Sequence, residues 1–475
     1  DPLSIPTLIT FVAYLFIILG IGMAASLRSG SMNGYLLGGR SLGPVTTALS
    51  AGASDMSGWL LLGLPGAVYL SGLSEVWIAV GLTIGAFFNW TFVAGPLRST
   101  TAASGAMTLP GFFALRFAVT DADFATRLLR VVSALVILLF FTFYAASGLV
   151  AGARLFEASF GLSYSLALGV GALVIVSYTA LGGFLAVSWT DVLQGTIMLL
   201  ALVAVPVVIL SGLPDAPLAH EPSSYLSAVE GVSALSAASL LAWGLGYFGQ
   251  PHILTRFMAA RDDEAIARGR AIGMSWMVVT LACAVSVGVL GNAYLHASGA
   301  PLGPGTTETV FITLTQVVFN PWVGGVLLAA ILSAIMSTID SQLLVSSSVL
   351  TEDLYRPLRP QAGDRELVLV GRVMVLVICA VAAAIATDPQ SQVLGLVSYA
   401  WAGLGAAFGP VVLFSLYGRG TTHWGAVAGM VTGAVTVVVW SGLSGGLFDL
   451  YELLPAFLLA CLAIEVVSRM TSDPA

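Results

Sequence analysis

Long apolar segments recur along the whole of the 475-residue chain, separated by short polar stretches. An apolar segment of about 20 residues is long enough to cross the hydrocarbon core of a membrane as an α-helix. The pattern predicts about 13 such spans, at residues 7–26, 44–71, 74–96, 131–153, 164–183, 189–212, 233–258, 273–297, 320–350, 367–387, 393–417, 423–443 and 450–469. We therefore predict an all-α polytopic membrane protein.

Composition and charge agree with this prediction and add an orientation. Hydrophobic residues make up 58% of the chain and charged residues only 9%, whereas soluble domains carry about 25% charged residues. The chain contains no lysine, so its basic residues are all arginine. With 13 spans and an outer N-terminus, every arginine except Arg154 falls on the cytoplasmic side, as the positive-inside rule requires. We expect a multi-pass protein with its N-terminus outside and its C-terminus in the cytoplasm.

Two of the predicted spans are interrupted by glycine and proline. The second contains "GASDMSGWLLLGLPGAV" (52–68), and the seventh contains "LAWGLGYFGQPHI" (241–253). Irregular backbone at membrane depth persists only where it is buried in protein or lines a cavity. A pair of interrupted helices in corresponding positions of two halves is typical of transporters with inverted repeats. Packing alone also favours glycine and proline in membrane helices, so one broken span would carry little weight.

The spacing of the breaks predicts the LeuT-type architecture, a five-plus-five inverted repeat with broken second and seventh spans. Residues 1–43 form a first membrane helix and a cytoplasmic loop in this prediction. Residues 44–212 form the first five-helix repeat, and residues 213–417 form the second. Two C-terminal membrane helices follow in residues 418–475.

Candidate cation ligands lie in the ninth span. Ala334, Ser337 and Thr338 stand at positions i, i+3 and i+4, so they share one face of a helix. One carbonyl and two hydroxyl groups there would suit a small hard cation such as Na⁺, and the broken second span offers the free carbonyls of Ala53 and Met56. The alternative is that the two hydroxyls bond back to carbonyls of their own helix, as is common in membrane helices.

Three aspartates within predicted spans bear on the ion site. Asp55 lies in the broken second span, and an intramembrane carboxylate is a functional candidate by default. We expect Asp55 to accept hydrogen bonds that hold the broken helix or to contribute negative potential, with direct ligation of the ion as the alternative. Asp340 lies about 200° around the helix from Thr338, so it faces away from the ion site. Asp191, at the start of the sixth span, is either functional or an interfacial acid at a helix start.

Six sequence blocks carry a family resemblance: "SAGASDMSGWLLLGLPGAVYLSG", "FFTFYAASGLVAGARLFE", "GGFLAVSWTDVLQ", "WGLGYFGQPHILTRFMAA", "MSTIDSQLLVSSSVLTEDLY" and "VLGLVSYAWAGLGAAFGPVVL". They resemble the proline branch of the solute:sodium symporter family in bacteria, over nearly the whole chain. The resemblance implies the 13-span inverted-repeat fold and Na⁺-coupled uptake of L-proline across the bacterial cytoplasmic membrane. It implies no cofactor besides the coupling ion Na⁺, and no partner besides L-proline, Na⁺ and the lipid bilayer; nucleic acid is not expected.

The resemblance also assigns roles to individual residues. The sodium ligands that it implies are Ala53, Met56, Ala334, Ser337 and Thr338. It associates Asp55 with sodium coupling and places Asp191 on the sodium exit route. The residues that it connects with substrate binding are Ser57, Gly58, Trp59, Tyr144, Trp243 and Tyr247. An aromatic pocket suits proline, because a pyrrolidine ring stacks on aromatic faces and its ammonium group can make cation–π contacts.

Other functions remain as alternatives. Within the transporter class, the substrate could be pantothenate, another amino acid or a small carboxylate, and protons could replace sodium with Asp55 as the carrier. A channel would need a continuous polar stripe through several helices, whereas the polar positions here are isolated. A membrane enzyme would need a His/Asp/Glu constellation, which the sequence does not indicate. We therefore predict a secondary transporter and not an enzyme.

Overall fold

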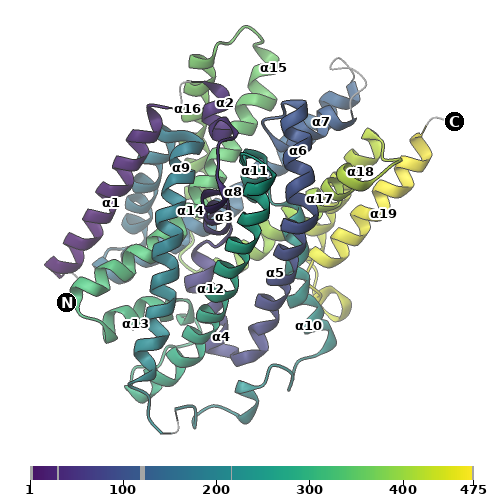
Figure 1. Ribbon diagram of the computed structural model, residues 1–475. Coiled ribbons are helices and arrows are strands. Elements are labelled where there is room, and N and C mark those ends of the chain that lie inside the picture. Colours follow the sequence, from purple (N-terminus) through teal and green to yellow (C-terminus); the bar gives the residue numbers. More distant parts are fainter. Residues whose placement is uncertain (1–3, 29–30, 118–123, 216, 473–475) are drawn as a thin grey trace.

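The computed structural model describes residues 4–28, 31–117, 124–215 and 217–472. In this part of the chain the structure is helical, without β-strands, and its long helices run side by side as a bundle (Figure 1). The helices that build the bundle are α1 (Ile5–Ser26), α3 (Pro44–Asp55), α4 (Leu64–Ser71), α5 (Val76–Phe88), α6 (Ala94–Ser104), α8 (Phe124–Phe160), α9 (Tyr164–Leu210), α10 (Ala234–Leu241), α11 (Pro251–Ala259), α12 (Asp263–Ala297), α14 (Pro321–Val349), α16 (Asp364–Ile385), α17 (Val393–Tyr417), α18 (His423–Ser441) and α19 (Leu453–Thr471).

Ten helices in the described residues are long and apolar enough to cross a membrane. Two shorter apolar helices, Tyr164–Ser177 and Ala234–Gly249, coincide with predicted spans. One of the ten candidates, Trp59–Ser104, contains parts of two predicted spans. Within it Gly72 ends α4 with φ +77°, and α5 begins at Val76. The prediction of a multi-helix membrane protein is confirmed, while the count of 13 stays a prediction.

Helix α9 contains a break that the hydropathy pattern placed between two spans. Gly183 has φ +65° and ψ −160°, outside the helical region. Glycine adopts this conformation without steric penalty. A Cβ atom at this position would also lie only 2.6 Å from the Tyr35 ring. Gly183 therefore divides α9 near the end of the predicted span 164–183.

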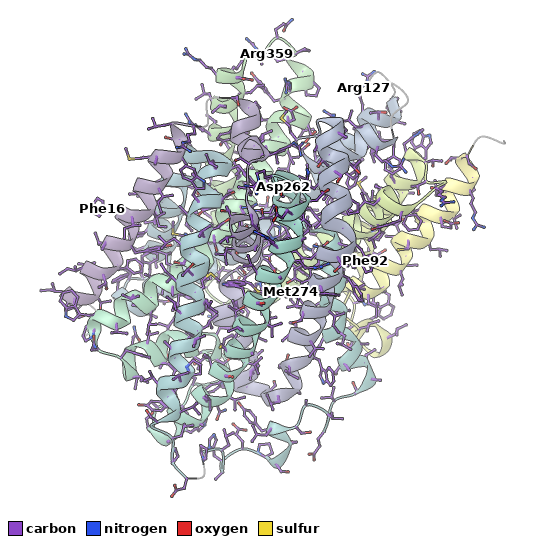
Figure 2. The ribbon with its side chains drawn as sticks, in the orientation of Figure 1. Phe16, Phe92, Arg127, Asp262, Met274 and Arg359 are labelled. Carbon is purple, nitrogen blue, oxygen red and sulfur yellow. The ribbon has the colours of Figure 1, made fainter. Side chains whose placement is uncertain are left out.

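The degree of burial separates a central helix from peripheral ones. Every residue of α14 from Leu327 to Val349 is buried. By contrast, large apolar side chains on outer helices are exposed, such as Phe16 at 70% and Phe92 at 48%, and both lie at the surface of the bundle (Figure 2). An exposed apolar belt of this kind is what a lipid-facing surface requires.

Two labelled arginines mark one end of the bundle. Arg127 and Arg359 lie at the upper end in Figure 2, together with α7 (Leu109–Phe117) and α15 (Arg356–Leu358) in Figure 1. The connection between α9 and α10 lies at the opposite end, where the short helix η5 (Ser223–Leu226) interrupts it. The Tyr225 hydroxyl donates hydrogen bonds of 2.9 Å to the carbonyls of Val68 and Tyr69, so this connection is tied to the end of α4.

Candidate functional site

The first interrupted helix breaks at Met56. Helix α3 ends at Asp55, Met56 has φ −78° and ψ 82°, and a π-helical turn (Trp59–Gly63) leads into α4. The Ser57 N–H donates to the Asp55 carbonyl at 2.9 Å instead of to the Ala53 carbonyl four residues back. The Ala53 carbonyl therefore has no helical partner. It is fully buried, so it must find another donor.

The donors come from the central helix α14. Ser337 Oγ donates to the Ala53 carbonyl at 2.7 Å, and Thr338 Oγ1 donates to the same oxygen at 3.2 Å. Ser337 Oγ also lies 3.2 Å from the Ala334 carbonyl. Four of the five predicted sodium-site residues are thus in direct contact, and the fifth, Met56, is completely buried in the break itself. These neutral oxygens are the ligand type that a small hard cation takes.

The second interrupted helix breaks at Gln250. Helix α10 continues as a 3₁₀-helix (Ala242–Gly249), Gln250 is extended at φ −87° and ψ 105°, and Pro251 begins α11. The Gln250 side-chain amide donates to the carbonyls of Gly246 and Trp401, at 3.0 and 3.1 Å. The Gln250 side chain thereby ties the break to α17. Both breaks predicted from the sequence are therefore observed.

A hydrogen bond between Tyr247 and Asp55 joins the two breaks. The Tyr247 hydroxyl donates to Asp55 Oδ2, and Trp59 Nε1 donates to the Asp55 carbonyl at 3.2 Å. Asp55 Oδ1 is buried and accepts no hydrogen bond from the described residues. Asp55 thus connects two segments that are 192 residues apart in the chain, an arrangement that favours the indirect role expected for this carboxylate.

The remaining residues predicted to bind substrate lie near these breaks. Ser57 Oγ accepts from the Trp59 N–H at 3.3 Å. A Cβ atom on Gly58 would lie 2.9 Å from the Ala151 Cβ, which explains the close approach of α8 to the break. The Tyr144 ring meets the buried His252 ring edge-to-face at 5.6 Å. Its hydroxyl finds no partner among the described residues.

Trp243 has a different environment from the other predicted substrate residues. Its indole stacks on Tyr451 at 5.2 Å and faces Trp401 at 6.4 Å. Tyr247 lies edge-to-face with the same Trp401 at 5.0 Å. Trp401 therefore links the two predicted aromatic residues, although no pattern in the sequence singled it out.

The space around Asp55 is small. Asp55, Met56, Asn89 and Tyr247 are among the residues that line a cavity of about 20 Å³, which is enough for one water-sized group. A proline molecule does not fit in this volume, so its binding here requires the surrounding helices to move apart. Asn89 lies at the start of a second π-helical turn (Asn89–Val93), and such turns are frequent at functional sites.

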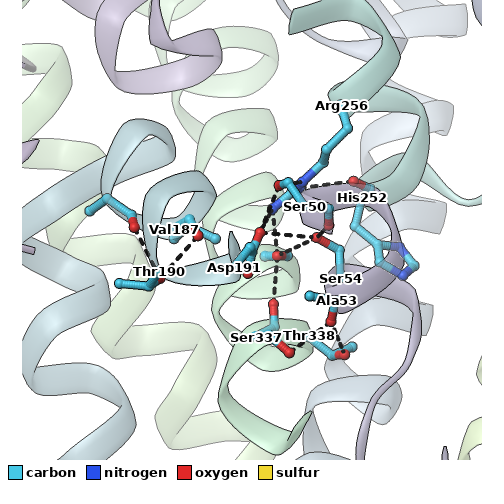
Figure 3. Close-up of polar contacts among 12 residues, drawn as sticks. Ser50, Ala53, Ser54, Val187, Thr190, Asp191, His252, Arg256, Ser337 and Thr338 are labelled. Carbon is cyan, nitrogen blue, oxygen red and sulfur yellow. Dashed lines mark hydrogen bonds and ion pairs between the residues drawn. The ribbon is translucent and has the colours of Figure 1, made fainter. Parts of the chain in front are cut away.

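A charged cluster that was not predicted lies beside the Ala53 contact (Figure 3). Asp191 is completely buried, and it forms an ion pair with the equally buried Arg256, with 3.4 Å between Oδ2 and Nη2. Ser50 Oγ donates to Asp191 at 2.7 Å and lies 3.0 Å from Arg256 Nε. The Arg256 guanidinium also lies over the Phe184 ring at 5.1 Å. Asp191 is therefore buried and lies well beyond the break at Gly183 instead of at a helix start, while its role in sodium coupling stays a prediction.

Two serines connect this cluster with the oxygen site. Arg256 Nη2 donates to Ser341 Oγ at 2.6 Å, and Ser341 Oγ donates to the Ser337 carbonyl at 2.7 Å. Ser54 Oγ lies 3.1 Å from Ser341 Oγ. Asp340, on another face of α14, accepts a hydrogen bond from Thr179 instead, consistent with the expectation that it faces away from the ion site.

A sequence signal for the ion pair was available. Arg256 and Asp191 both lie inside predicted spans, at residues 233–258 and 189–212, and charges inside a membrane normally pair with one another. The positive-inside rule counted Arg256 as a cytoplasmic arginine, whereas the structure places its side chain within the bundle. Spacing along the chain could not indicate its partner, which is 65 residues away.

Comparisons with known proteins find relatives over nearly the whole chain. The sequence profile described as "Sodium:solute symporter family" matches residues 35–433. The chain is 52% identical to the sodium/proline symporter of Salmonella typhimurium, over 99% of this chain and 94% of that protein. It is 49% identical to a high-affinity proline transporter of Bacillus subtilis, over 96% of both chains.

Among solved structures, a Na⁺-coupled sialic acid symporter in a substrate-bound, outward-open state matches the fold with a TM-score of 0.83. The match covers 100% of this chain and 99% of that chain at 16% sequence identity. At this level of identity the likeness concerns the fold alone.

Proposed function

The chain belongs to the sodium:solute symporter family, and from this premise we propose that it imports L-proline together with Na⁺. The proposal is supported by relatives of about 50% identity over nearly the full length, which are named as proline transporters. Pantothenate or another carboxylate is not favoured as substrate, because these relatives are named for proline. Secondary transport also agrees with a bundle of apolar helices that is broken twice at its centre.

The observation that carries the ion assignment is the meeting of two hydroxyls with one unpaired carbonyl. Ser337 and Thr338 both donate to the Ala53 carbonyl, which the break at Met56 leaves without a helical donor. A sodium ion that enters here would replace these hydrogen bonds, and the same oxygens would become its ligands. We assign the ion to Ala53, Met56, Ala334, Ser337 and Thr338.

Substrate binding is assigned to the residues around the two breaks. Ser57, Gly58 and Trp59 belong to the first break, and Tyr247 belongs to the second and bonds to Asp55. Tyr144 and Trp243 complete the predicted aromatic set. Opening the small cavity beside Asp55 would expose aromatic faces to the pyrrolidine ring and a carboxylate to its ammonium group.

The finer architecture belongs to the same proposal. We assign residues 44–212 and 213–417 to two inverted five-helix repeats, each beginning with an interrupted helix, flanked by residues 1–43 and 418–475. The end of the bundle that carries Arg127 and Arg359 then faces the cytoplasm of a bacterial cell. Asp191 and Arg256 lie between the ion site and this end, so release of Na⁺ to the inside requires their ion pair to separate.

The membrane potential can drive accumulation in this scheme. Moving one positive charge through 100 mV is worth about 2.3 kcal/mol, which corresponds to roughly 50-fold accumulation of the solute. The sodium gradient adds to this value. Alternating access would come from rocking of one helical unit against the other around the buried site.

Uptake of labelled L-proline into proteoliposomes of the purified protein tests the proposal. We expect accumulation with an inward sodium gradient, and none when choline replaces sodium. The variant Thr338→Ala should lose sodium-dependent uptake, while Thr338→Ser, which keeps the hydroxyl, should retain it. Ser333→Ala is a matched control, because Ser333 lies on the same buried helix, donates to the Ala329 carbonyl at 2.8 Å and is not one of the assigned ion ligands.

Three results would contradict parts of the proposal. Equal uptake in choline would remove sodium as the coupling ion and favour Asp55 as a proton carrier. Normal sodium dependence in Thr338→Ala would remove the ion assignment but leave symport intact. Absence of proline uptake under every gradient would remove proline as the substrate.

A further inference from the structure

A groove of about 950 Å³ lies on the outer surface of the bundle, between the faces of α9 and α12. Figure 1 shows α9 between α1 and α12 on this side of the molecule. Apolar side chains form most of its wall, among them Leu200 and Val203 of α9 and Ile272 and Val279 of α12. Leu200 is 64% exposed and Val279 42%, so the groove opens on the apolar belt of the bundle.

Polar side chains in the groove are few, and their donors are already used. The lining contains Thr196, Ser275 and Trp276 besides apolar residues. The hydroxyls of Thr196 and Ser275 donate to carbonyls of their own helices, at 2.7 and 2.8 Å. Trp276 Nε1 donates to the Gly195 carbonyl at 2.9 Å. The groove therefore has no free side-chain donor for a polar solute and suits an apolar chain.

A charged pair stands at the end of the groove that we assign to the cytoplasm. Arg268 precedes Ile272 by four residues and Ser275 by seven, so it lies on the groove face of α12, about 6 Å beyond Ile272. Glu264, one turn closer to the helix start, pairs with Arg268 at 3.0 Å. Both side chains are exposed, so their charges are open to a third group at the membrane surface.

The α9 side of the groove indicates where the membrane surface lies. Trp189 precedes Thr196 by seven residues and so lies on the same helix face, about 10 Å closer to the cytoplasmic end. The Arg28 guanidinium lies over the Trp189 ring at 5.2 Å. Tryptophan and arginine are typical of the headgroup level on the cytoplasmic side of a membrane. The groove thus extends from the headgroup level into the hydrocarbon region.

These features together fit a phospholipid with a zwitterionic headgroup. An acyl chain gains no hydrophobic free energy by leaving other lipid for the groove, because both are apolar. Its binding therefore depends on close packing and on the headgroup. Phosphatidylethanolamine carries a phosphate and a primary ammonium group, which complement Arg268 and Glu264. An anionic headgroup without the ammonium would leave Glu264 unmatched, and a choline headgroup has no N–H to donate.

We propose that this groove binds one phosphatidylethanolamine molecule, with an acyl chain between α9 and α12 and the headgroup at Glu264 and Arg268. The lipid then belongs to the folded protein as a bound partner, in contrast to lipids that exchange freely around the rest of the apolar belt.

The acyl chain lies against helices that build the oxygen site. Leu49 of α3 lines the groove. The Trp276 ring packs so closely on α3 that a Cβ atom on Gly52 would lie 2.9 Å from it. The carbonyl of Ala53, the next residue, is the oxygen that we assign to the ion. A bound lipid therefore holds this part of α3 against α12.

Native mass spectrometry of the delipidated full-length protein tests the proposal. On titration with dioleoyl phosphatidylethanolamine, we expect the monomer to retain one lipid before any further lipid binds. Val203→Trp fills the groove from α9 and Ala271→Trp fills it from α12, and each should weaken this retention about tenfold or more. Val435→Trp is the matched control, because Val435 is 54% exposed on α18, outside the groove.

A change of charge tests the position of the headgroup. Arg268→Met should weaken retention about threefold, as a solvated charge contact allows. Arg419→Met, at an exposed arginine between α17 and α18, should leave retention unchanged. Phosphatidylcholine and phosphatidylglycerol with the same chains should bind the parent about threefold more weakly. Equal retention of all three lipids, or no effect of Arg268→Met, would overturn the headgroup assignment.

Thermal unfolding in detergent gives a second readout. Phosphatidylethanolamine should raise the unfolding midpoint of the parent and of Val435→Trp, because a ligand that binds only the folded protein stabilises it. It should not raise the midpoint of Val203→Trp, and the midpoint of this variant without lipid shows that it is folded. Equal retention in Val203→Trp and the parent, or loss of retention in Val435→Trp, would overturn the groove as the binding site.

A second copy of the chain is the competing occupant. A protein dimer that forms in place of the lipid complex and is lost in Val203→Trp would identify it and overturn the proposal. None of these measurements uses sodium or proline, so a failure of the proposed function would leave their outcome unaffected.

Discussion

The oxygen site at Ala53 and the ion pair of Asp191 with Arg256 are neighbours connected through Ser341, but they are built from different chemistry. The first consists of one carbonyl and two hydroxyls, all neutral. The second consists of two full charges with no solvent exposure. A neutral oxygen cluster binds a cation without trapping it, because it forms alternative hydrogen bonds when the ion leaves. The charged groups of a buried ion pair have no comparable alternative partners. The pair therefore holds its helices together until the two groups separate.

The difference suggests a division of labour between binding and closure. Ser337 and Thr338 can exchange a carbonyl for an ion with little loss of hydrogen bonding. Arg256 contacts α3 through Ser50, α9 through Asp191 and α14 through Ser341. It therefore keeps three helices together on the side that we assign to the cytoplasm. Substitutions in the oxygen site and in the ion pair should therefore affect different properties, sodium affinity and stability, and by different amounts.

Removal of the Arg256 charge should have the largest effect. In Arg256→Met, Asp191 stays buried without a partner, and breaking a buried pair in this way costs about 3–5 kcal/mol. We expect a strongly lowered thermal unfolding midpoint in detergent and loss of sodium-coupled uptake. The double variant Arg256→Met with Asp191→Asn should recover most of the stability, since no unpaired charge remains.

An exposed ion pair provides the control for this prediction. Arg268 and Glu264 are 3.0 Å apart, with side chains 68% and 59% exposed. Exposed pairs contribute about 0–1 kcal/mol, so Arg268→Met should unfold close to the parent. Equal unfolding midpoints for Arg256→Met and Arg268→Met would contradict the closing role of the buried pair.

Substitution in the oxygen site should affect sodium affinity more than stability. Ser337 is the only side chain that contacts both the Ala53 and the Ala334 carbonyl within the described residues. Losing a ligand to a charged group is worth about 1.5–3 kcal/mol, or roughly a 10- to 100-fold weaker ion affinity. In Ser337→Ala we expect the sodium concentration for half-maximal uptake to rise by this factor. An unfolding midpoint that falls as far as in Arg256→Met, with sodium dependence unchanged, would refute the comparison.

Substitution of Ser341 tests whether the oxygen site and the ion pair are energetically coupled. Ser341 accepts from Arg256 and donates to the Ser337 carbonyl. Ser341→Ala removes the hydrogen bond to the Ser337 carbonyl, worth about 1 kcal/mol, as well as one acceptor of Arg256, so we expect a sodium affinity about fivefold weaker. A double-mutant cycle with Ser337→Ala should then be non-additive. Strict additivity would mean that the ion pair does not sense the ion site.

Features that depend on local order along the chain were predictable. The break at Met56 follows from glycine, serine and proline within one apolar run, and the ligand face of α14 follows from the spacing of Ala334, Ser337 and Thr338. The break at Gln250 follows from a glycine-rich segment before Pro251. In each case the signal lies within one or two helical turns.

Features that depend on which helix faces meet were not predictable. The contact of Tyr247 with Asp55 joins residues 192 positions apart, and Arg256 reaches Asp191 across 65. Hydropathy and spacing say which face of a helix is polar but not which neighbour it meets. For the same reason Trp243 was grouped with the central site, although its ring lies between Trp401 and Tyr451.

Substitution of Asp262 should have the smallest effect, because its ion pair is exposed whereas that of Asp191 is buried. Asp262 also pairs with an arginine, Arg261, at 2.8 Å, but both side chains are exposed at the start of α12 (Figure 2). The hydrogen bond from Arg261, followed by that from the Ala265 N–H at 2.8 Å, lowers the pKa of Asp262. A carboxyl group whose pKa is lower in the folded state stabilises the fold above its unfolded pKa, about 3.9, and loses this contribution as the pH falls through its folded value.

Two variants of this aspartate separate its charge from its capping role. Asp262→Asn keeps a good N-cap residue, so we expect nearly parental unfolding at neutral pH and a weaker fall of the midpoint on acidification below about pH 4. Asp262→Ala should be slightly less stable at every pH because the cap is lost. Transport should be unchanged in both, since Asp262 lies at the helix start and touches neither cluster. Loss of uptake in Asp262→Asn, of the kind expected for Arg256→Met, would contradict this comparison. It would mean that burial does not decide what an Arg–Asp ion pair contributes to transport.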